Sequence, residues 1–341
     1  PTATLTAKDI TASNGTRMTF TIKFTDQSGM NGPTVNNNST LVTITGPKGF
    51  SVKATFMSIV VGQDGSRTVT YSFVPPGGSW DAADAGTYVI KIAGGVVKDT
   101  VGNTMAATTA GSFYMSPTPF FDERFYLAHN SDVAAAITAG YFTSGYQHFL
   151  NYGQTSGRDP SAFFNEKTYL SLNPDVAAAV RAHYFKSGFD HLIKNGLKEK
   201  RKVNAFFDET FYLAQNTDVA AAVRAGLYKS GLDHYLQAGQ FEGRSPSVAF
   251  IDSYYRAQNP SVVTLVANGT YSSVFQHFLQ VGQQAGLAAN TFFNESFYLT
   301  NYPDIASQVR AGIYKSGLEQ YMLVGMSQGK LPNAAAKPRH A

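Results

Sequence analysis

Hydrophobic positions follow two different periods along this chain. In the first third, apolar and polar residues alternate in short runs such as Met18–Phe24, Thr68–Phe73 and Tyr88–Ile92. A period of two is typical of strands that bury one face. Clusters rich in glycine, proline and aspartate separate the runs, as at Gly46–Gly49, and such clusters form turns. Seven or so strands in about 115 residues predict a β-sandwich over residues 1–116.

From residue 117 the chain repeats itself every 43 residues without insertion or deletion. The period is marked by recurring tyrosines (Tyr126, Tyr169, Tyr212, Tyr255, Tyr298), glycines (Gly153, Gly196, Gly239, Gly282, Gly325) and histidines (His148, His191, His234, His277). A fixed period of this length indicates an array in which each unit buries its apolar face against its neighbours. The five copies cover about 120–160, 163–203, 206–246, 249–289 and 292–332.

Each copy predicts three short helical pieces, so residues 117–333 are predicted to be all-α. The first piece begins at an N-cap residue (Asp122, Asn165, Asp208, Asn294). The second begins at Asn-Pro-Asp or a variant, as at Asn173–Asp175, since proline and aspartate favour the first helical turn. It ends at a C-cap glycine (Gly140, Gly226, Gly269, Gly312), which repeat two replaces with His183. The third runs from a Ser-Gly pair to the periodic glycine, as from Ser187 to Gly196.

Repeat four departs most from this pattern. Ile251 replaces the N-cap residue and Val274 replaces a periodic glycine. Weaker caps there predict a bend or a contact surface. Repeat five has Gln320 in place of the histidine, and residues 334–341 are predicted to be a disordered tail.

One motif narrows the prediction for the first domain. Asp84-Ala-Gly-Thr-Tyr88 matches the D-x-G-x-Y pattern that starts strand F of immunoglobulin-like domains. Together with Gly46–Phe50, Pro76–Trp80 and Asp99–Asn103, it resembles an Ig-like module of large bacterial surface and secreted proteins. The resemblance implies that the Tyr88 hydroxyl closes a tyrosine corner onto upstream backbone.

The repeat also resembles a known unit. Its pattern of F-[DN]-E, N-P-D-V-A-A-A-V and a C-terminal G-x-x-E-G-R is similar to a repeat common in secreted and surface-associated cyanobacterial proteins. Such repeats accompany Ig-like, calcium-binding or glycosyltransferase segments. The resemblance implies no general activity for the repeat itself.

Composition restricts the class of protein further. Of 341 residues only 15% are charged, and the net charge of +4 is too small and too diffuse to predict nucleic-acid binding. There is no cysteine, so disulfides and thiolate metal sites are excluded. No run reaches the roughly 18 apolar residues of a membrane span, so the chain is predicted not to cross a membrane. The chain opens at Pro1 in a predicted strand, which favours a processed or excised origin.

Two clusters are candidate ligand sites. Oxygen-bearing side chains in the loops of the β-domain could gather Ca²⁺, namely Asp81, Asp84, Asp99 and Asn103. The alternative is that these residues form turns. A basic cluster in the array could meet an anionic polysaccharide, namely Lys194, Lys198, Lys200, Arg201 and Lys202. The alternative is a solvated loop between repeats two and three.

The periodic histidines could supply one metal ligand or proton switch per repeat. The alternative is a half-buried histidine that hydrogen-bonds a neighbouring turn. Because one copy supplies one histidine and no cysteine, a repeat alone cannot provide the three or four ligands that zinc needs. The Asp of N-P-D could bind a cation, and helix-end electrostatics is the alternative.

No motif for a catalytic nucleophile or for phosphate binding is present, since both G-x-S-x-G and G-x-x-x-x-G-K-[ST] are missing. We therefore expect a non-catalytic extracellular or cell-surface structural protein. Its role would be adhesion or self-assembly into fibres or layers, with itself or other surface proteins as partners. Two alternatives stay open: a module that binds envelope polysaccharide, and an accessory part of a secreted enzyme. No cofactor other than calcium is predicted.

Overall fold

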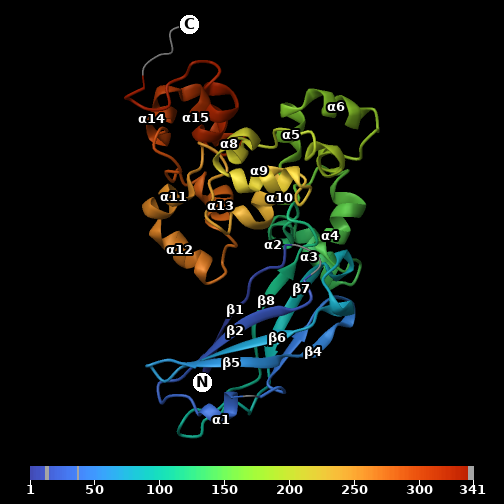
Figure 1. Ribbon diagram of the computed structural model, residues 1–341, viewed down its shortest axis with the longest axis vertical. Coiled ribbons are helices and arrows are strands. Elements are labelled where there is room, and N and C mark those ends of the chain that lie inside the picture. The colour runs from blue at the N-terminus through green and yellow to red at the C-terminus, as the bar shows by residue number, and fades with distance from the viewer. Residues whose placement is uncertain (12–14, 37, 337–341) are drawn as a thin grey trace. The chain divides into compact units, whose positions relative to one another are not determined.

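The computed structural model describes residues 1–11, 15–36 and 38–336 (Figure 1). Strands occupy the chain up to Met115, and the first helix of the array begins at Glu123. The chain divides into two compact units, Pro1–Tyr152 and Gly153–Ala341, so the first unit contains the sandwich and most of repeat one. The predicted β-domain followed by an all-α array is confirmed.

Two four-stranded antiparallel sheets form the β-domain. The first has the order β1 (Thr2–Thr6), β2 (Met18–Thr25), β6 (Arg67–Phe73), β5 (Thr55–Val61). The second has the order β4 (Ser51–Lys53), β3 (Val42–Thr45), β7 (Gly86–Ile92), β8 (Thr108–Met115). Short helical turns lie between the strands: α1 (Gly32–Val35), η1 (Pro47–Gly49), η2 (Pro76–Gly78) and η3 (Ala82–Asp84).

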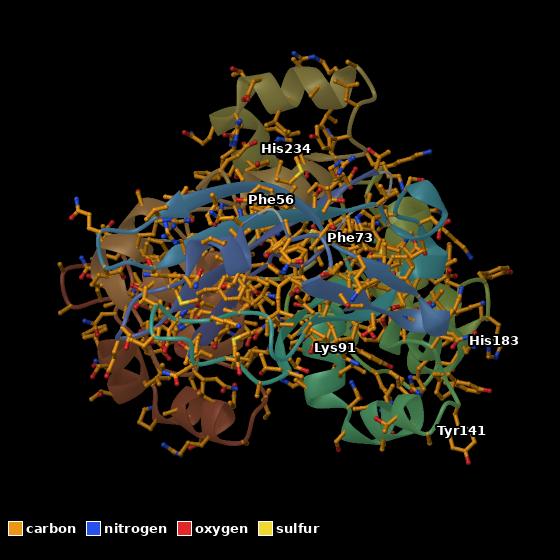
Figure 2. All side chains as sticks on the ribbon, turned by 90° about the horizontal axis from the view of Figure 1, so that it is seen from below. Phe56, Phe73, Lys91, Tyr141, His183 and His234 are labelled. Atoms are coloured by element: carbon orange, nitrogen blue, oxygen red, sulfur yellow. The ribbon has the colours of Figure 1, made fainter. Side chains whose placement is uncertain are left out.

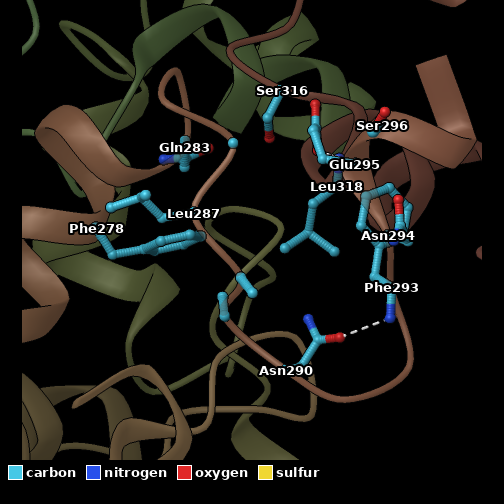
Figure 3. Close-up of a pocket in the computed structure, with 13 residues that line it drawn as sticks. Phe278, Gln283, Leu287, Asn290, Phe293, Asn294, Glu295, Ser296, Ser316 and Leu318 are labelled. Atoms are coloured by element: carbon cyan, nitrogen blue, oxygen red, sulfur yellow. Dashed lines mark hydrogen bonds between the residues drawn. The ribbon is translucent and has the colours of Figure 1, made fainter. Parts of the chain in front are cut away.

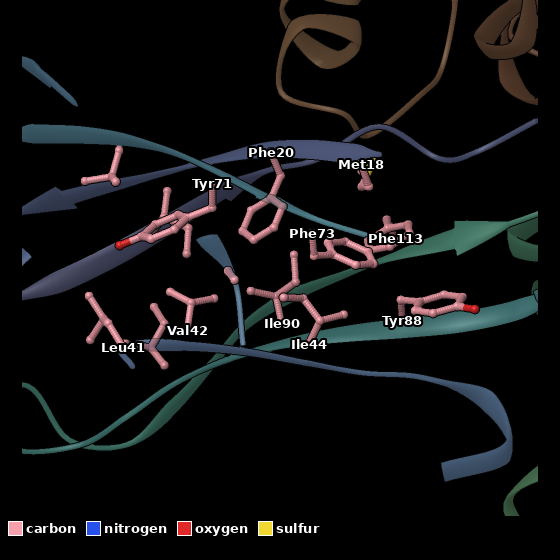
Figure 4. Close-up of a cluster of buried hydrophobic side chains, with 14 of the residues drawn as sticks. Met18, Phe20, Leu41, Val42, Ile44, Tyr71, Phe73, Tyr88, Ile90 and Phe113 are labelled. Atoms are coloured by element: carbon pink, nitrogen blue, oxygen red, sulfur yellow. The ribbon is translucent and has the colours of Figure 1, made fainter. Parts of the chain in front are cut away.

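Both sheets contribute alternate side chains to one core. Phe20 and Tyr71 from the first sheet meet Ile44 and Ile90 from the second, and all four are at most 3% exposed (Figure 4). This inward alternation is the physical reason for the period of two in the sequence. The tyrosine corner implied by the Ig-like resemblance is present, because the Tyr88 hydroxyl donates to the Asp84 carbonyl at 3.0 Å.

One strand differs from its sequence pattern. The alternating run Val52–Phe56 is divided at Ala54 between β4 in one sheet and β5 in the other. Strand β5 then continues to Val61, with a bulge between Phe56 and Ser58 that shifts its register against β6. A bulge breaks the period of two, which is why alternation does not extend over Ser58–Val61.

Each repeat contains the three predicted helical pieces. The first helices are α2 (Glu123–His129), α5 (Glu166–Leu172), α8 (Glu209–Gln215), α11 (Asp252–Gln258) and α14 (Glu295–Asn301). The second helices are α3 (Ser131–Thr138), α6 (Pro174–Arg181), α9 (Thr217–Arg224), α12 (Pro260–Ala267) and α15 (Pro303–Arg310). The third helices are α4 (Gly145–His148), α7 (Gly188–His191), α10 (Gly231–His234), α13 (Val274–His277) and α16 (Gly317–Gln320).

Every third helix continues as a π-helical turn that ends at the periodic glycine. These turns are Phe149–Gly153, Leu192–Gly196, Tyr235–Gly239, Phe278–Gly282 and Tyr321–Gly325. In the last four repeats a Cβ on that glycine would lie 2.0 to 2.5 Å from the hydroxyl oxygen of the repeat's periodic tyrosine. The glycine is therefore required by the close approach of the tyrosine.

The predicted helix caps are present. In four repeats the side chain of the N-cap residue accepts a backbone hydrogen bond from the first turn, as Asp208 does from Phe211 at 2.8 Å. Ile251 in repeat four makes no such bond. The glycines after the second helix have φ between 72° and 82°, and His183 adopts φ 61° in their place.

Repeats two to five do not form a straight row within Gly153–Ala341. The rings of Phe163 in repeat two and Phe275 in repeat four lie 6.3 Å apart, although repeat three separates them in the chain. Phe206 and Phe278 join repeats three and four at 5.0 Å. The path therefore curls, so that repeats distant in sequence share a core.

A polar contact also repeats at each junction of this unit. The amide of Asn204 donates to the carbonyl of Phe163 at 2.8 Å, and Ser247 donates to Phe206 at 2.7 Å. Asn290 makes the same bond to Ala249. In the predicted tail, Ala335 and Ala336 donate backbone hydrogen bonds to the Asn333 side chain, and positions 337–341 lie outside the described residues.

Candidate functional site

The predicted calcium ligands Asp81 and Asp84 organise one turn. The Asp81 carboxylate accepts the backbone N–H of Ala83 at 2.7 Å, and the Asp84 carboxylate accepts the N–H of Asp81 at 3.1 Å. The two therefore form a capping box around η3. Burial raises the pKa of the Asp84 carboxyl, although the backbone bond opposes this.

Asp99 and Asn103 organise a second turn. The Asp99 carboxylate accepts backbone N–H groups of Val101 at 3.0 Å and Asn103 at 2.8 Å. It also accepts the side-chain amide of Asn103 at 2.7 Å. These are the bonds by which an aspartate stabilises a turn without any ion.

The structure does not bring the four candidate calcium ligands together. Asp84 precedes strand β7 and Asp99 follows it, and a strand of this length spans about 23 Å. One ion cannot bridge that distance. Among the residues that the structure describes, no group of three or more His, Asp or Glu side chains is placed to hold a metal ion.

The basic cluster is partly engaged within its own repeat. Arg201 forms a bidentate pair with Asp175, the aspartate of N-P-D, at 3.0 and 2.7 Å. Lys194 pairs with Asp190 at 2.9 Å. Lys198, Lys200 and Lys202 are exposed. Because two of the five cations have carboxylate partners, the net positive potential over this loop is smaller than the sequence suggests.

The periodic histidines contact tyrosines. The hydroxyls of Tyr169, Tyr212 and Tyr255 lie 2.8 to 2.9 Å from Nδ1 of the histidine 22 residues later in the same repeat. Burial lowers the pKa of His191, His234 and His277, which favours the neutral imidazole. Each histidine therefore joins the first helix of its repeat to the third, and the partner is a tyrosine and not the expected turn.

A second polar contact was not anticipated from the sequence. The Glu209 carboxylate accepts the backbone N–H of Gly231 at 2.7 Å and of Leu232 at 3.0 Å, at the start of α10. Repeats one, two and five repeat this contact. It satisfies N–H groups that a helix start otherwise leaves unpaired. The recurring glutamate of F-[DN]-E could have indicated this contact, but the sequence does not show which backbone N–H groups the glutamate binds.

Repeat four replaces the whole contact. A Cβ on Gly231 would lie 3.1 Å from a Glu209 carboxylate oxygen, so a larger residue at position 231 would crowd the glutamate. Repeat four has Val274 in the glycine position and Asp252 in the glutamate position. Asp252 instead pairs with Arg256 at 2.5 Å. Asp252 and Val274 therefore change together, whereas Ile251 is a separate departure that removes the N-cap bond.

Strand β5 is an exposed edge of the sandwich. Within the described residues it pairs with β6 on one side and has no strand on the other. Met57, Val60 and Val61 are 50%, 66% and 56% exposed. The strand carries no charged residue. Natural proteins protect free edges with charges, prolines or very short strands, and β4, the edge strand of the second sheet, is short and ends at Lys53.

The repeats also expose apolar side chains at one periodic position. Tyr184, Leu227 and Ile313 follow the second helix of their repeats and are 79%, 74% and 60% exposed. Tyr141 holds this position in repeat one, where Figure 2 shows its side chain directed away from the ribbon. The position recurs every 43 residues, but repeat four carries Thr270 there, so four of the five repeats expose an apolar or aromatic side chain at this point.

Two cavities adjoin Gln283 in the unit formed by repeats two to five. One measures about 230 Å³ and lies between repeats four and five (Figure 3). The other measures about 430 Å³ and is lined by residues of repeats two, three, four and five, including Phe163, Phe206 and Tyr314. Both are within the described residues, and neither was expected from the sequence because their walls come from several copies.

Comparison with known proteins yields little. No model of a protein family matches the chain, and no curated protein does. Two solved structures are similar over a minor part: surface layer protein SbsC domains 1–6 (23% identity) and the S-layer protein rSbsC(31-844) (26% identity). The matches cover 33% and 34% of this chain and 14% of each of those chains, with a TM-score of 0.21 in both cases. Among the described residues, no helix is both long and apolar enough to span a membrane.

Proposed function

We propose that this chain is a non-catalytic structural protein of the cell surface that assembles with further copies of itself. The observation that carries the proposal is the free edge of β5, whose seven residues are uncharged and partly apolar. An unpaired edge presents a row of N–H and C=O groups that another strand can bind. The surface location is supported by the low charge content and the resemblance of both regions to bacterial surface modules.

The partner strand is supplied by a second copy. Strand β1 is the opposite edge of the same sheet and is also uncharged. Pairing β5 of one copy with β1 of the next is a heterologous contact, and such contacts propagate into open fibres or layers unless the rotation closes a ring. Pairing β5 with β5 is self-complementary and ends at a dimer.

The proposal is tested by placing a charge on the edge. Val60→Lys puts an ammonium group on a side chain that is 66% exposed, so the fold is retained while strand addition is opposed. Val101→Lys is the matched control, because Val101 is 71% exposed and lies outside the strands. The mass of each protein is measured by light scattering over a range of concentrations, with calcium and with chelator.

We expect the original chain and Val101→Lys to form large assemblies and Val60→Lys to remain monomeric. An original chain that stays monomeric at high concentration, or a Val60→Lys variant that assembles equally well, rejects the proposal. If assembly stops at a dimer, the proposed fibre or layer is rejected, and only the pairing of β5 with β5 is supported. Antibody labelling of intact cells tests the surface location separately.

A further inference from the structure

Three of the four junctions between repeats carry a glutamine and a serine at equivalent positions, and the junction of repeats two and three has Leu197 in place of the glutamine. Between repeats three and four, the Ser273 hydroxyl donates to the Gln240 side-chain oxygen at 2.7 Å. Ser187 makes the same bond to Gln154 at 3.2 Å. The junction of repeats four and five carries the corresponding residues Gln283 and Ser316. Sequence alone therefore predicts a third bond of the same kind.

That bond is not formed. Within the part of the chain that the structure describes, the side-chain oxygen of Gln283 has no hydrogen-bond partner, although the residue is only 4% exposed. Its amide nitrogen donates to the Leu279 carbonyl at 3.3 Å, which fixes the orientation of the group. Ser316 is 2% exposed and accepts the N–H of Glu319 at 3.0 Å. A buried acceptor without a donor is rare in native proteins and calls for a partner.

The space between the two residues is a cavity of about 230 Å³, in which Figure 3 shows Gln283 and Ser316 on the wall without a bond between them. A cavity of this size holds far more than the single water that one acceptor needs. The buried acceptor and the cavity are independent observations, and both lie at the Gln–Ser junction where the hydrogen bond is missing.

The walls define the chemistry of the ligand. Phe278 and Phe293 provide apolar ring surface, and Ser296 and Ser316 provide hydroxyl groups. Among the described residues that line this cavity there is no lysine, arginine or histidine, and the one carboxylate among them, Glu295, already accepts two backbone N–H groups of α16. An anion would find no charge partner here. A compact neutral molecule with several hydroxyl donors and one apolar face fits, because small-ligand sites combine apolar walls with few oriented polar groups.

We propose that the cavity between repeats four and five binds one neutral hexose ring, free or at the end of a glycan. One sugar hydroxyl donates to the Gln283 side-chain oxygen, and a second accepts from the Ser316 hydroxyl. The apolar face of the ring lies against an aromatic side chain. The site is distinct from strand β5 and from the basic cluster, so it does not depend on the proposed self-assembly.

The test uses the full chain and a panel of D-glucose, D-galactose, D-mannose and D-glucuronate. Binding is measured by isothermal titration calorimetry and by saturation-transfer NMR. The variants are Gln283→Leu and Ser316→Ala, and the matched control is Gln240→Leu at the closed junction of repeats three and four.

We expect at least one neutral hexose to bind, and Gln283→Leu to weaken its affinity by about fivefold to tenfold, since the loss of one hydrogen bond corresponds to roughly that factor. Gln240→Leu leaves the affinity unchanged, and D-glucuronate binds more weakly than the neutral sugar. Absence of binding for every neutral hexose at about 10 mM overturns the proposal, as does equal affinity in Gln283→Leu. If either variant unfolds, the side-chain amide resonance of Gln283 in the original chain decides: a hexose that does not move it does not bind there.

Discussion

The sandwich and the repeats bury their aromatic side chains in different ways. In the sandwich, Phe113 is fully buried against the rings of Phe73, Trp80 and Tyr88, which come from distant parts of the sequence. In a repeat, the periodic tyrosine of the first helix has a polar partner 22 residues away in the same copy, which is a histidine or Gln320. The rings around Phe113 therefore pack across the two sheets, whereas the core of each repeat combines ring packing with a polar contact made inside one 43-residue copy.

This difference separates contacts that a duplicated repeat retains from contacts that duplication does not guarantee. A contact within one 43-residue unit is reproduced whenever the unit is duplicated, because both partners are copied together. The Tyr–His and Glu–backbone contacts are of this kind. Contacts between units depend on the path of the array, so the Gln–Ser bond forms at two junctions and is absent at a third although its residues are the same.

The largest effect is expected from opening the apolar core. Phe113→Ala removes a ring that is fully buried, and deletions of this size cost about 3–5 kcal/mol of unfolding free energy. Scanning calorimetry should show the transition of the sandwich lowered and that of repeats two to five unchanged. Tyr141→Ala is the control, since its side chain is 79% exposed and its removal should change neither transition. An equal shift of both transitions by Phe113→Ala would contradict two independently stable cores.

The second prediction concerns acid sensitivity of the polar contacts. Buried His191, His234 and His277 have lowered pKa values, so they bind fewer protons when folded than when unfolded. Their contribution to stability is present above the unfolded pKa of about 6.5 and is lost as the pH falls below it. The sandwich, residues 1–116, contains no histidine. We therefore expect the repeat transition to lose stability between pH 7 and 5 by a mechanism that the sandwich lacks.

The control variant replaces these three histidines with glutamine, which repeat five already carries as Gln320. Burial raises the pKa of Glu166, Glu209 and Glu295, and these carboxyls act in the opposite direction as the pH falls. They are unchanged in the variant, so the difference in melting temperature between the two proteins isolates the histidines. A variant that loses as much stability on acidification as the original chain would count against this assignment.

The smallest effect is expected at two positions where repeat two departs from its copies. His183 and Lys200 adopt φ of 61° and 54°, where the other repeats have glycine. A left-handed conformation costs a residue with a Cβ roughly 1–2 kcal/mol, so His183→Gly and Lys200→Gly should each stabilise the repeats by about 1 kcal/mol. Gly226→Ala is the reverse control and should destabilise, since φ is 75° there and no atom lies near the added Cβ. Denaturant unfolding measures all three, and a destabilising His183→Gly would show that its side chain contributes more than its backbone costs.

Sequence reasoning reached the architecture because its signals are local. Alternation over Tyr88–Ile92, the N-cap at Asp208 and the glycines after the second helices depend on neighbours within a few residues, and each was found as predicted. The bulge after Phe56 was not predicted, because a single inserted residue removes the period that identifies the strand. The exposed edge that supports self-assembly lies in that part of β5.

The sequence by itself determined the two regions, the five copies, the starts of the helices and the tyrosine corner. It grouped Asp81, Asp84, Asp99 and Asn103 as one candidate site, but β7 holds the two turns apart. Only the tertiary structure placed Phe163 of repeat two against Phe275 of repeat four and left Gln283 beside a cavity without a donor. The physical reason is the sequence separation of the residues involved. Backbone geometry and helix capping act over a few residues, whereas a sheet edge, a junction between repeats or a cavity depends on how distant segments pack.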